Sequence, residues 1–368
     1  MNSLAVAAIR NWLLTSNVQI PEGPQKGGVA GWLDEKGHPA FVYAEATGYY
    51  LTGMAFMLAV SRTDENAVLN HAYRALAWLD RCCREGKIPL TRCYLSPHNH
   101  DWKNQVRFAF DLVMILRGVA AVRGLVAEEP RRRVQEALIG SLVPFREPGG
   151  FLSPFLPSNS APAALVPARW STTPGPYQLK IAASLLLPLK CEIPPELRDA
   201  CETIQSKWCR PLHSGGLTGE WHADLYFIEG LVLLGLHHRD SRAWALARES
   251  YQALMNRCEG SAPSLNAVAL PEPAVRSDVI AQLLRAGCIL RSYGYLGEFV
   301  WAQRLNCLAQ LLQHFITEEG AVSFGRMDLE GPTHWNAWCA LFAYQALCFH
   351  EVVSGRGKLE KRWIQLLI

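Results

Sequence analysis

The sequence has few charged residues and almost no excess of either sign. Asp, Glu, Lys and Arg make up 19% of its 368 residues, and the formal net charge is only +3. The densest basic run is Arg131-Arg132-Arg133, and no aromatic residues are interleaved with it. Nucleic-acid-binding proteins normally gather positive charge on one face or along one helix. We therefore do not expect nucleic acid as a partner.

The sequence predicts neither a signal peptide nor a membrane-spanning segment. Residues 1–17 lack a basic start and a long apolar core before a small-residue cleavage site, so they are interpreted as a helix rather than a signal peptide. No run approaches 18 apolar residues without a charge or a helix breaker, and Pro188 interrupts the apolar run 181–189. We expect a cytoplasmic protein that does not enter the membrane.

The eleven cysteines do not form a recognisable framework. Their number is odd, no C-x-x-C pair occurs, and several lie on apolar helical faces. Without a signal peptide, buried reduced thiols are favoured over disulfides.

Motifs for common cofactors are absent. There is no P-loop, no G-x-G-x-x-G after a strand, no G-x-S-x-G and no H-E-x-x-H. His98-Asn99-His100-Asp101 lacks a third ligand at a defined spacing, so solvated loop histidines are favoured over a metal site. We expect neither a metal nor a cofactor, and the sequence does not indicate an oligomeric state.

Two kinds of helical segment alternate along the chain, which is 49% hydrophobic. Amphipathic segments have one apolar stripe; in 65–86 this stripe is Val68, Ala72, Leu76 and Leu79. They lie near 4–18, 65–86, 130–145, 196–210, 241–258 and 296–316. The segments between them are apolar nearly all round and should be buried: 43–60, 106–124, 177–189, 222–237, 276–290 and 334–350.

This sixfold alternation predicts an all-α, (α/α)6 toroid of six helical hairpins, because no hairpin could bury its inner face alone. Small residues in the apolar segments, such as Gly48 and Gly118, would let helices approach closely. Glycine-led elements precede several of these segments and predict tight turns into short extended pieces, so β structure should be confined to loops. We predict one domain, 1–368, with 354–368 as a C-terminal extension.

Polar side chains recur at the start of each buried helix. If the inner helices are parallel, these side chains converge on one mouth with apolar walls, where carboxylate pKa values can be pushed apart. Helix capping is the competing explanation for any single residue among them. Asp111 and Glu45 are the best acid and base candidates because they lie deep among apolar neighbours. Asp224 and Asp278 are the other carboxylate candidates, and Asp278 follows Ser277 and could simply cap its helix.

Aromatic and polar residues near the same helix starts could bind a ligand. An isolated Trp is more often part of the core, but several in equivalent loops favour stacking platforms for a sugar. The candidate binding residues are Trp32, Tyr49, Trp102, Trp170, Tyr177, Trp221, His222, Tyr226, Arg276, His334, Trp335 and Asn336.

The helix openings FVYAEATGYYLTGM, FAFDLVMILRG, HADLYFIEGL, VRSDVIAQLLR and HWNAWCALFAYQAL resemble the six-hairpin glycosidase-like superfamily. The resemblance covers about residues 1–350. It implies the (α/α)6 architecture and a carbohydrate or another small polar ligand in the mouth. No catalytic signature of a subfamily matches residue by residue, so the resemblance assigns no catalytic residue.

Three functions remain open. A glycoside hydrolase would use two carboxylates among Glu45, Asp111, Asp224 and Asp278. A uronate lyase or sugar epimerase would use Tyr226, His222 or His334 as base, with Arg276 or Asn336 on a sugar carboxylate. A non-catalytic carbohydrate-binding or scaffold protein would keep the toroid without the chemistry. The hydrolase is our first hypothesis.

Overall fold

Apolar patterning decides which helices lie inside. In the computed structural model of the protein, every residue of the inner helix α2 from Ala44 to Leu58 is buried. Outer helices bury one face, which in α3 includes the predicted stripe of Val68, Ala72, Leu76 and Leu79. The structure describes residues 2–96, 101–157, 166–189, 192–209, 217–258, 275–297, 299–325 and 334–368.

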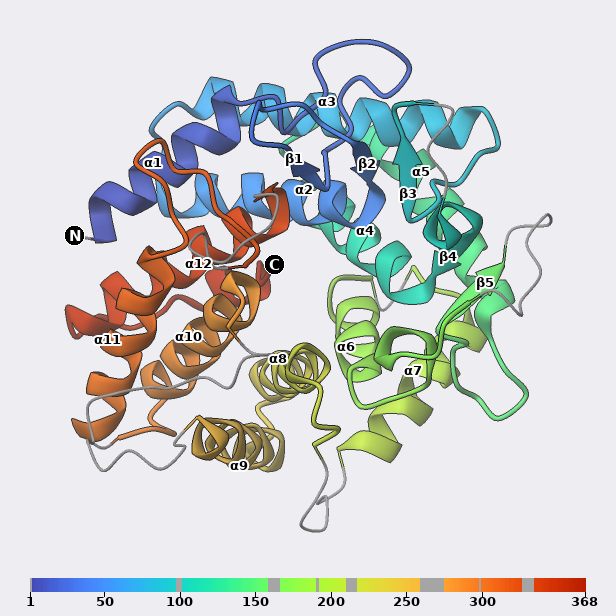
Figure 1. The fold of residues 1–368 in the computed structure, drawn as a ribbon. Coiled ribbons are helices and arrows are strands. Elements are labelled where there is room, and N and C mark those ends of the chain that lie inside the picture. The colour runs from blue at the N-terminus through green and yellow to red at the C-terminus, as the bar shows by residue number, and fades with distance from the viewer. Residues whose placement is uncertain are drawn as a thin grey trace.

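The inner helices surround a common axis, and the outer helices surround them (Figure 1). Each inner helix contacts the next, α12 contacts α2 to close the ring, and each outer helix packs on an inner one. The predicted toroid is confirmed. The inner helices are α2 (Ala44–Val60), α4 (Ala109–Ala121), α6 (Gln178–Leu189), α8 (Trp221–His238), α10 (Ser277–Ser292) and α12 (Ala337–Ser354). The outer helices are α1 (Asn2–Thr15), α3 (Glu65–Arg84), α5 (Glu128–Leu142), α7 (Pro195–Trp208), α9 (Ser241–Arg257) and α11 (Phe299–Gln313).

The strands are short and lie in connections between helices, as predicted. Three of them, β2, β4 and β6, run directly into the inner helices α2, α4 and α12. Antiparallel pairing joins β2 to β3, β4 to β5 and β1 to β6, and the last pair links the two ends of the ring. The strands are β1 (Trp32–Leu33), β2 (Phe41–Tyr43), β3 (Arg92–Tyr94), β4 (Val106–Phe108), β5 (Phe155–Pro157) and β6 (Trp335–Asn336); the short helices are η1 (Trp102–Gln105), η2 (Val143–Phe145), η4 (Trp170–Thr172) and α13 (Lys361–Gln365).

Two glycines bring α2 and α4 into backbone contact. A Cβ atom on Gly118 would overlap the backbone carbonyl of Gly48, and one on Gly48 would overlap the backbone of Ile115. The close approach predicted from these small residues is confirmed. It places the first turns of α2 and α4, which carry Glu45 and Asp111, on neighbouring helices.

The glycine-led elements form tight turns. Gly27, Gly150 and Gly320 have positive φ, and each is followed within two residues by an antiparallel bridge residue. A further glycine-led element of the sequence, at residues 215–217, lies largely outside the described residues. At Gly320 the turn also touches helix α1, because a Cβ atom there would overlap the backbone of Ala8.

We expect Gly320→Ala to destabilise the fold more than Gly23→Ala. Both glycines have positive φ (91° and 75°), which costs a residue with a side chain about 1–2 kcal/mol. Only at Gly320 must α1 also move, which adds about 1–3 kcal/mol, because no atom lies within 4 Å of a Cβ on Gly23. Chemical unfolding of both variants measures the difference. Equal losses would show that the contact with α1 carries no cost.

The stretch 354–368, predicted as a C-terminal extension, folds back into the ring. Leu367 and Ile368 are fully buried, and the end of the chain lies near the axis (Figure 1). Arg117 of α4 donates hydrogen bonds to the backbone carbonyls of Gln365 and Leu367. This segment therefore fills the ring beneath the open end described next.

Candidate active site

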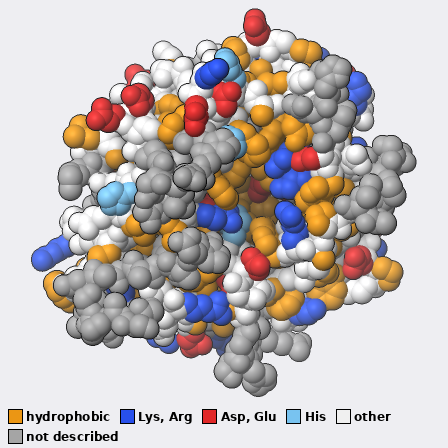
Figure 2. Space-filling view, in the orientation of Figure 1, with side chains coloured by type: hydrophobic (Ala, Val, Ile, Leu, Met, Phe, Trp, Pro, Cys, Tyr) orange, Lys and Arg blue, Asp and Glu red, His pale blue; other side chains and the backbone are white. Residues whose placement is uncertain are grey.

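A cavity opens at the end of the ring where the inner helices begin. Its volume is about 470 Å3, and in the space-filling view it appears as a hollow with apolar walls and Lys and Arg side chains around it (Figure 2). Concave sites with mainly apolar walls and a few converging polar groups are the usual form of small-ligand sites. It is lined by Trp32, Tyr43, Glu45, Ala46, Tyr49, Arg92, Lys103, Phe108, Phe110, Asp111, Arg169, Trp170, Ser171, His222, Tyr226, Arg276, Asp278, Phe324, His334, Asn336 and Trp338.

Most of the residues singled out from the sequence border this cavity. They come from the starts of five inner helices, or from the strand or loop just before them. The carboxylates among them are Glu45, Asp111 and Asp278, and the predicted binding residues are Trp32, Tyr49, Trp170, His222, Tyr226, Arg276, His334 and Asn336.

Asp224 does not line the cavity, which corrects its place among the catalytic candidates. Its carboxylate accepts hydrogen bonds from the backbone N–H of Thr218 (2.7 Å), the Thr218 hydroxyl (2.8 Å) and the backbone N–H of Gly219 (3.1 Å). Asp224 therefore holds the segment before α8 in place. The sequence placed it in the first turn of an inner helix but could not show which way it faces.

Four predicted aromatic residues also lie outside the cavity lining. Trp335 precedes Asn336 in strand β6, and because neighbouring strand residues face opposite sides, only Asn336 reaches the cavity. Trp221 is buried at the start of α8 beside His222, whose different angle around the helix brings it to the cavity. The other two support the wall: Tyr177 packs edge-on against Trp170, and Trp102 against Phe108.

Glu45 and Asp111 form the buried acidic pair of the cavity. Their exposed fractions are 7% and 6%, and burial raises the pKa of both carboxyl groups. The charge of Glu45 raises the pKa of Asp111 further, so that it stands well above its usual range. Oδ2 of Asp111 has no hydrogen-bond partner among the described residues. Of the two, Asp111 therefore favours the protonated form more strongly, and Glu45 is the carboxyl group that is better stabilised as an anion.

Two tyrosines and a lysine support the negative charge of Glu45. The Tyr49 hydroxyl lies 2.7 Å from Glu45 Oε1, to which it donates, and 2.9 Å from the Tyr226 hydroxyl. Nζ of Lys180 lies 4.4 Å from the centre of the Tyr226 ring. The hydrogen bonds from Tyr49 and Tyr43 and the charge of Lys180 oppose the rise that burial causes in the pKa of Glu45.

Arg107 lies four residues before Asp111, which on one helix would allow a structural ion pair between them. No such pair exists within the described part of the chain, because Arg107 lies in strand β4 and not one helical turn before Asp111. The spacing of four residues therefore does not place the two side chains on one helical face.

The opposite wall carries an ion pair. Arg276 contacts both oxygens of Asp278, at 3.1 and 2.6 Å. Burial alone would raise the pKa of Asp278, but the charge of Arg276 holds it below its usual range. Nδ1 of His222 lies 3.9 Å from Asp278 Oδ2, and burial lowers the pKa of His222 to about 4. At neutral pH this wall thus presents a neutralised carboxylate and an uncharged imidazole.

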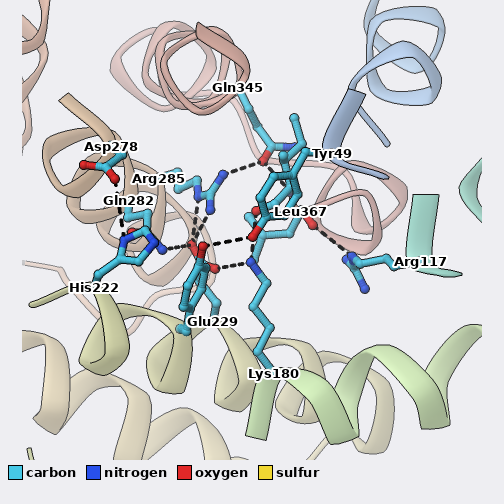
Figure 3. A network of polar contacts seen from close by, with 12 residues as sticks. Tyr49, Arg117, Lys180, His222, Glu229, Asp278, Gln282, Arg285, Gln345 and Leu367 are labelled. Carbon is cyan, nitrogen blue, oxygen red and sulfur yellow. Dashed lines mark hydrogen bonds and ion pairs between the residues drawn. The ribbon is translucent and has the colours of Figure 1, made fainter. Parts of the chain in front are cut away.

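Below the cavity, the ring axis is filled by a buried charge network (Figure 3). Glu229 of α8 accepts from Lys180 of α6 (2.7 Å) and from Arg285 of α10 (2.5 and 2.9 Å), and Arg285 also donates to Gln345 of α12. Lys180 and Gln345 in turn donate to backbone carbonyls of Ile368 and Leu366. This network lies beneath Tyr49 and Tyr226, which line the cavity and whose rings face Nζ of Lys180 at 5.7 and 4.4 Å, and it connects them to the end of the chain.

No family model matches the chain, and no curated protein matches it. Solved structures do match over nearly the whole chain at low identity. They include an unsaturated glucuronyl hydrolase specific for heparin (12% identity, TM-score 0.65, covering 96% of this chain and 99% of that one). Another is cellobiose 2-epimerase from Bacillus thermoamylovorans B4167 (11%, 0.66, 94% and 100%), and a third is the GH76A alpha-1,6-mannanase from Salegentibacter sp. HEL1_6 (11%, 0.60, 95% and 99%).

The chain has the same (α/α)6 toroid fold as these proteins. At these identities the likeness establishes the architecture and leaves the reaction open, since the fold carries hydrolases as well as an epimerase. None of the helices in the described ranges combines the length and apolar composition needed to cross a bilayer.

Several residues of the cavity were not predicted from the sequence, and Arg92, Lys103 and Arg169 were missed because they do not belong to inner helices. Arg92 lies in strand β3 and reaches the cavity because β3 pairs with β2, where it stands opposite Tyr43. Lys103 and Arg169 come from connections, and only their neighbours Trp102 and Trp170 gave any signal. Phe110 and Trp338 occupy the same first helical turns as the chosen residues. Their apolar character made them core candidates instead.

The loop considered as a metal site is only partly described. His98 and His100 lie outside the described residues, and Asp101 at its end pairs with Arg92 (2.6 Å). Within the described ranges, no group of three or more His, Cys, Asp or Glu side chains could hold a metal ion. The ten cysteines in these ranges are free thiols.

Proposed function

We propose that the protein hydrolyses a glycosidic bond in this cavity, with Asp111 as the general acid and Glu45 as the second carboxylate. The observation that carries the proposal is the unequal environment of the two acids. They start neighbouring inner helices, both are buried, and the charge of Glu45 adds to the burial that raises the pKa of Asp111. Two carboxyl groups whose pKa values are pushed apart are what acid–base cleavage of a glycoside requires.

The steps assigned to the two residues follow from their partners. Asp111 keeps its proton and has an unbonded Oδ2, so it can protonate the oxygen of the departing sugar. Glu45 is held as an anion by Tyr49 and can activate the water that attacks the sugar carbon. The bond between the sugar carbon and the leaving oxygen breaks, and the proton from water goes to Glu45. Trp32 and Trp170, on the walls, offer stacking surfaces for sugar rings.

A panel of glycosides tests the proposal directly. The purified protein is incubated with aryl glycosides of neutral, amino and acidic sugars, and the released phenol and the new reducing end are both measured. Release of both products from one or more glycosides supports hydrolysis. Complete inactivity towards the whole panel, together with binding of one of its sugars, would contradict it.

Proton abstraction is the second candidate, as in a lyase or epimerase. The observation that favours it is His222, which lines the cavity and is uncharged at neutral pH because burial lowers its pKa to about 4. An uncharged imidazole can accept a proton from a sugar carbon. Product analysis after reaction in D2O distinguishes the two functions. An epimerase places deuterium on a carbon of its product, a lyase leaves a carbon–carbon double bond in its product, and hydrolysis does neither.

We expect Tyr49→Phe to move the acidic limb of the pH–activity profile to higher pH. The Tyr49 hydroxyl donates to Glu45 and lowers the pKa of that carboxyl group, so its loss raises the pKa. Glu45 must be ionised to act as base, and the limb should shift by about one pH unit. Tyr50→Phe is the matched control, because the Tyr50 hydroxyl donates to the backbone carbonyl of Leu13, away from Glu45. An unshifted limb in Tyr49→Phe would remove Glu45 from the role of base.

A further inference from the structure

Two cations lie against one indole ring on the wall of the cavity. Nζ of Lys103 is 5.6 Å from the centre of the Trp102 ring, and the guanidinium carbon of Arg169 is 5.2 Å from it. Both side chains line the cavity, where Lys103 is half-buried and Arg169 is exposed on the rim. Trp102 therefore holds two positive charges at one side of the site.

The acid nearest to them in the sequence is already engaged. Asp101 pairs with Arg92 at 2.6 Å and accepts hydrogen bonds from the backbone N–H groups of Lys103 and Asn104, at 3.0 and 3.1 Å. Within the described ranges, no carboxylate oxygen lies within 4.0 Å of the Lys103 ammonium or the Arg169 guanidinium. Among the described residues, these two charges have no counter-ion.

Arg276, a further arginine of the cavity lining, shows the contrast. Arg276 makes two contacts with Asp278 and packs over the ring of Phe324, at 4.4 Å. Its charge is neutralised inside the protein. Burial lowers the pKa of Lys103, and the charge of Arg92 lowers it further, so positive charges crowd this wall. An anion placed between Lys103 and Arg169 would relieve that crowding.

The same wall is close to the acidic pair. Whenever Asp111 or Glu45 is ionised, its charge acts on Lys103 and partly opposes the lowering of the Lys103 pKa. A ligand group held by Lys103 therefore lies within the electrostatic reach of the two carboxyl groups. An anion bound at Lys103 would therefore lie close to the carboxyl groups that are proposed to break the glycosidic bond.

We propose that Lys103 and Arg169, backed by Trp102, form an anion subsite, and that the sugar taken by the cavity carries a negative group. A uronic-acid carboxylate and a sulfate or phosphate ester share the required chemistry, because each offers oxygens to an ammonium and a guanidinium. This inference rests on the proposed function for the statement that the ligand is a sugar. The anion subsite itself does not depend on hydrolysis.

Binding to the full-length protein tests the subsite without any need for turnover. Calorimetry compares four probes: methyl β-D-glucuronide, glucose 6-sulfate, glucose 6-phosphate and neutral methyl β-D-glucoside. We expect at least one anionic probe to bind about tenfold or more tightly than the glucoside, since hydrogen bonds to charged groups are the strong ones. Its affinity should fall as salt is added, whereas the affinity for the glucoside should not. The preference among the anionic probes tells a carboxylate from an ester.

Variants assign the preference to the two residues. Lys103→Gln and Arg169→Gln should each reduce the affinity for the preferred anion about tenfold and leave the affinity for the glucoside unchanged. Lys207→Gln is the matched control, because Lys207 also packs on aromatic rings, those of Phe151 and Trp208, but lies outside the cavity lining. Circular dichroism confirms that each variant is folded.

The outcomes separate the two proposals. Equal affinity for the anionic probes and the glucoside, no binding of any anionic probe, or an unchanged preference in both variants would overturn the subsite. Selective binding of an anion by a protein that cleaves no glycoside would contradict hydrolysis and leave the subsite standing.

Discussion

Asp111→Asn is expected to lower turnover about 10²–10⁴-fold, the usual contribution of a general acid, while leaving the fold intact. The asparagine has nearly the same shape as the aspartic acid but cannot give a proton to the leaving oxygen. Asp111 is 6% exposed and has no ion pair with Arg107, so its removal breaks no salt bridge to that residue. Steady-state kinetics on a glycoside that the wild-type protein cleaves measures the effect.

The free energy of unfolding of Asp111→Asn provides a test that does not depend on activity. Burial and the charge of Glu45 raise the pKa of Asp111 well above the value of about 3.9 expected in the unfolded chain. The folded state therefore binds a proton that the unfolded state releases, and stability is lost as pH rises from about 4 through the folded pKa. Asp111→Asn removes this loss. At neutral pH the variant should be as stable as the wild-type protein or more stable.

Asp224→Asn is the matched control, because Asp224 is also a buried carboxylate in the first turn of an inner helix. It accepts three hydrogen bonds from Thr218 and Gly219 and lies outside the cavity lining. We expect this control to lose about 1–3 kcal/mol of stability and to keep its activity once the folded fraction is taken into account. If Asp111→Asn behaves like the control, Asp111 is structural and the proton-abstraction candidate gains support.

The helices were predictable because burial leaves a periodic trace in the sequence. Helix α3 has one apolar stripe, at Val68, Ala72, Leu76 and Leu79, and it lies in the outer layer of the ring. Helix α2 is apolar nearly all round, and it lies in the inner layer. The start of an inner helix was equally visible. Glu45 and Asp111 could therefore be assigned to the mouth.

What could not be predicted depends on contacts between distant segments. Lys103 and Arg169 reach the cavity through connections whose path no periodicity encodes, and Arg92 does so through a strand pairing. Asp224 was predicted to face the cavity and does not line it. Its position in a first helical turn was visible in the sequence, but this position does not fix the direction of the side chain. Nothing in residues 359–368 indicated that they would fold back into the ring.

The largest effect on stability is expected from Glu229→Gln, at about 3–5 kcal/mol, the usual cost of removing one partner of a buried ion pair. Glu229 is 1% exposed, and its carboxylate accepts hydrogen bonds from Lys180 and Arg285, which are both fully buried. Arg117 adds a third buried cation to the same region, and burial lowers its pKa to about 10. Glu229 is thus the acid that balances the buried cations beneath the cavity. A glutamine of the same size leaves these cations without a counter-charge.

The pH dependence of that loss has a defined sign. Burial already lowers the pKa of Lys180 to about 7 with Glu229 beside it, and removal of the carboxylate lowers this pKa further. Below pH 7 the wild-type protein accepts the proton on Lys180 in the folded state, whereas the variant must unfold to accept it. The difference in unfolding free energy should therefore grow as pH falls below 7.

Chemical unfolding at pH 6 and pH 8 measures the loss, with two comparisons that identify its cause. Glu128→Gln removes the acid of another glutamate–arginine pair, but Glu128 is 63% exposed, so the expected loss is within about 1 kcal/mol. Adding Lys180→Met to Glu229→Gln removes one of the uncompensated cations. The double variant should lose less stability than the sum of the two single variants. A loss below about 1 kcal/mol in Glu229→Gln, or strict additivity with Lys180→Met, would show that the network under the cavity is not held by its charges.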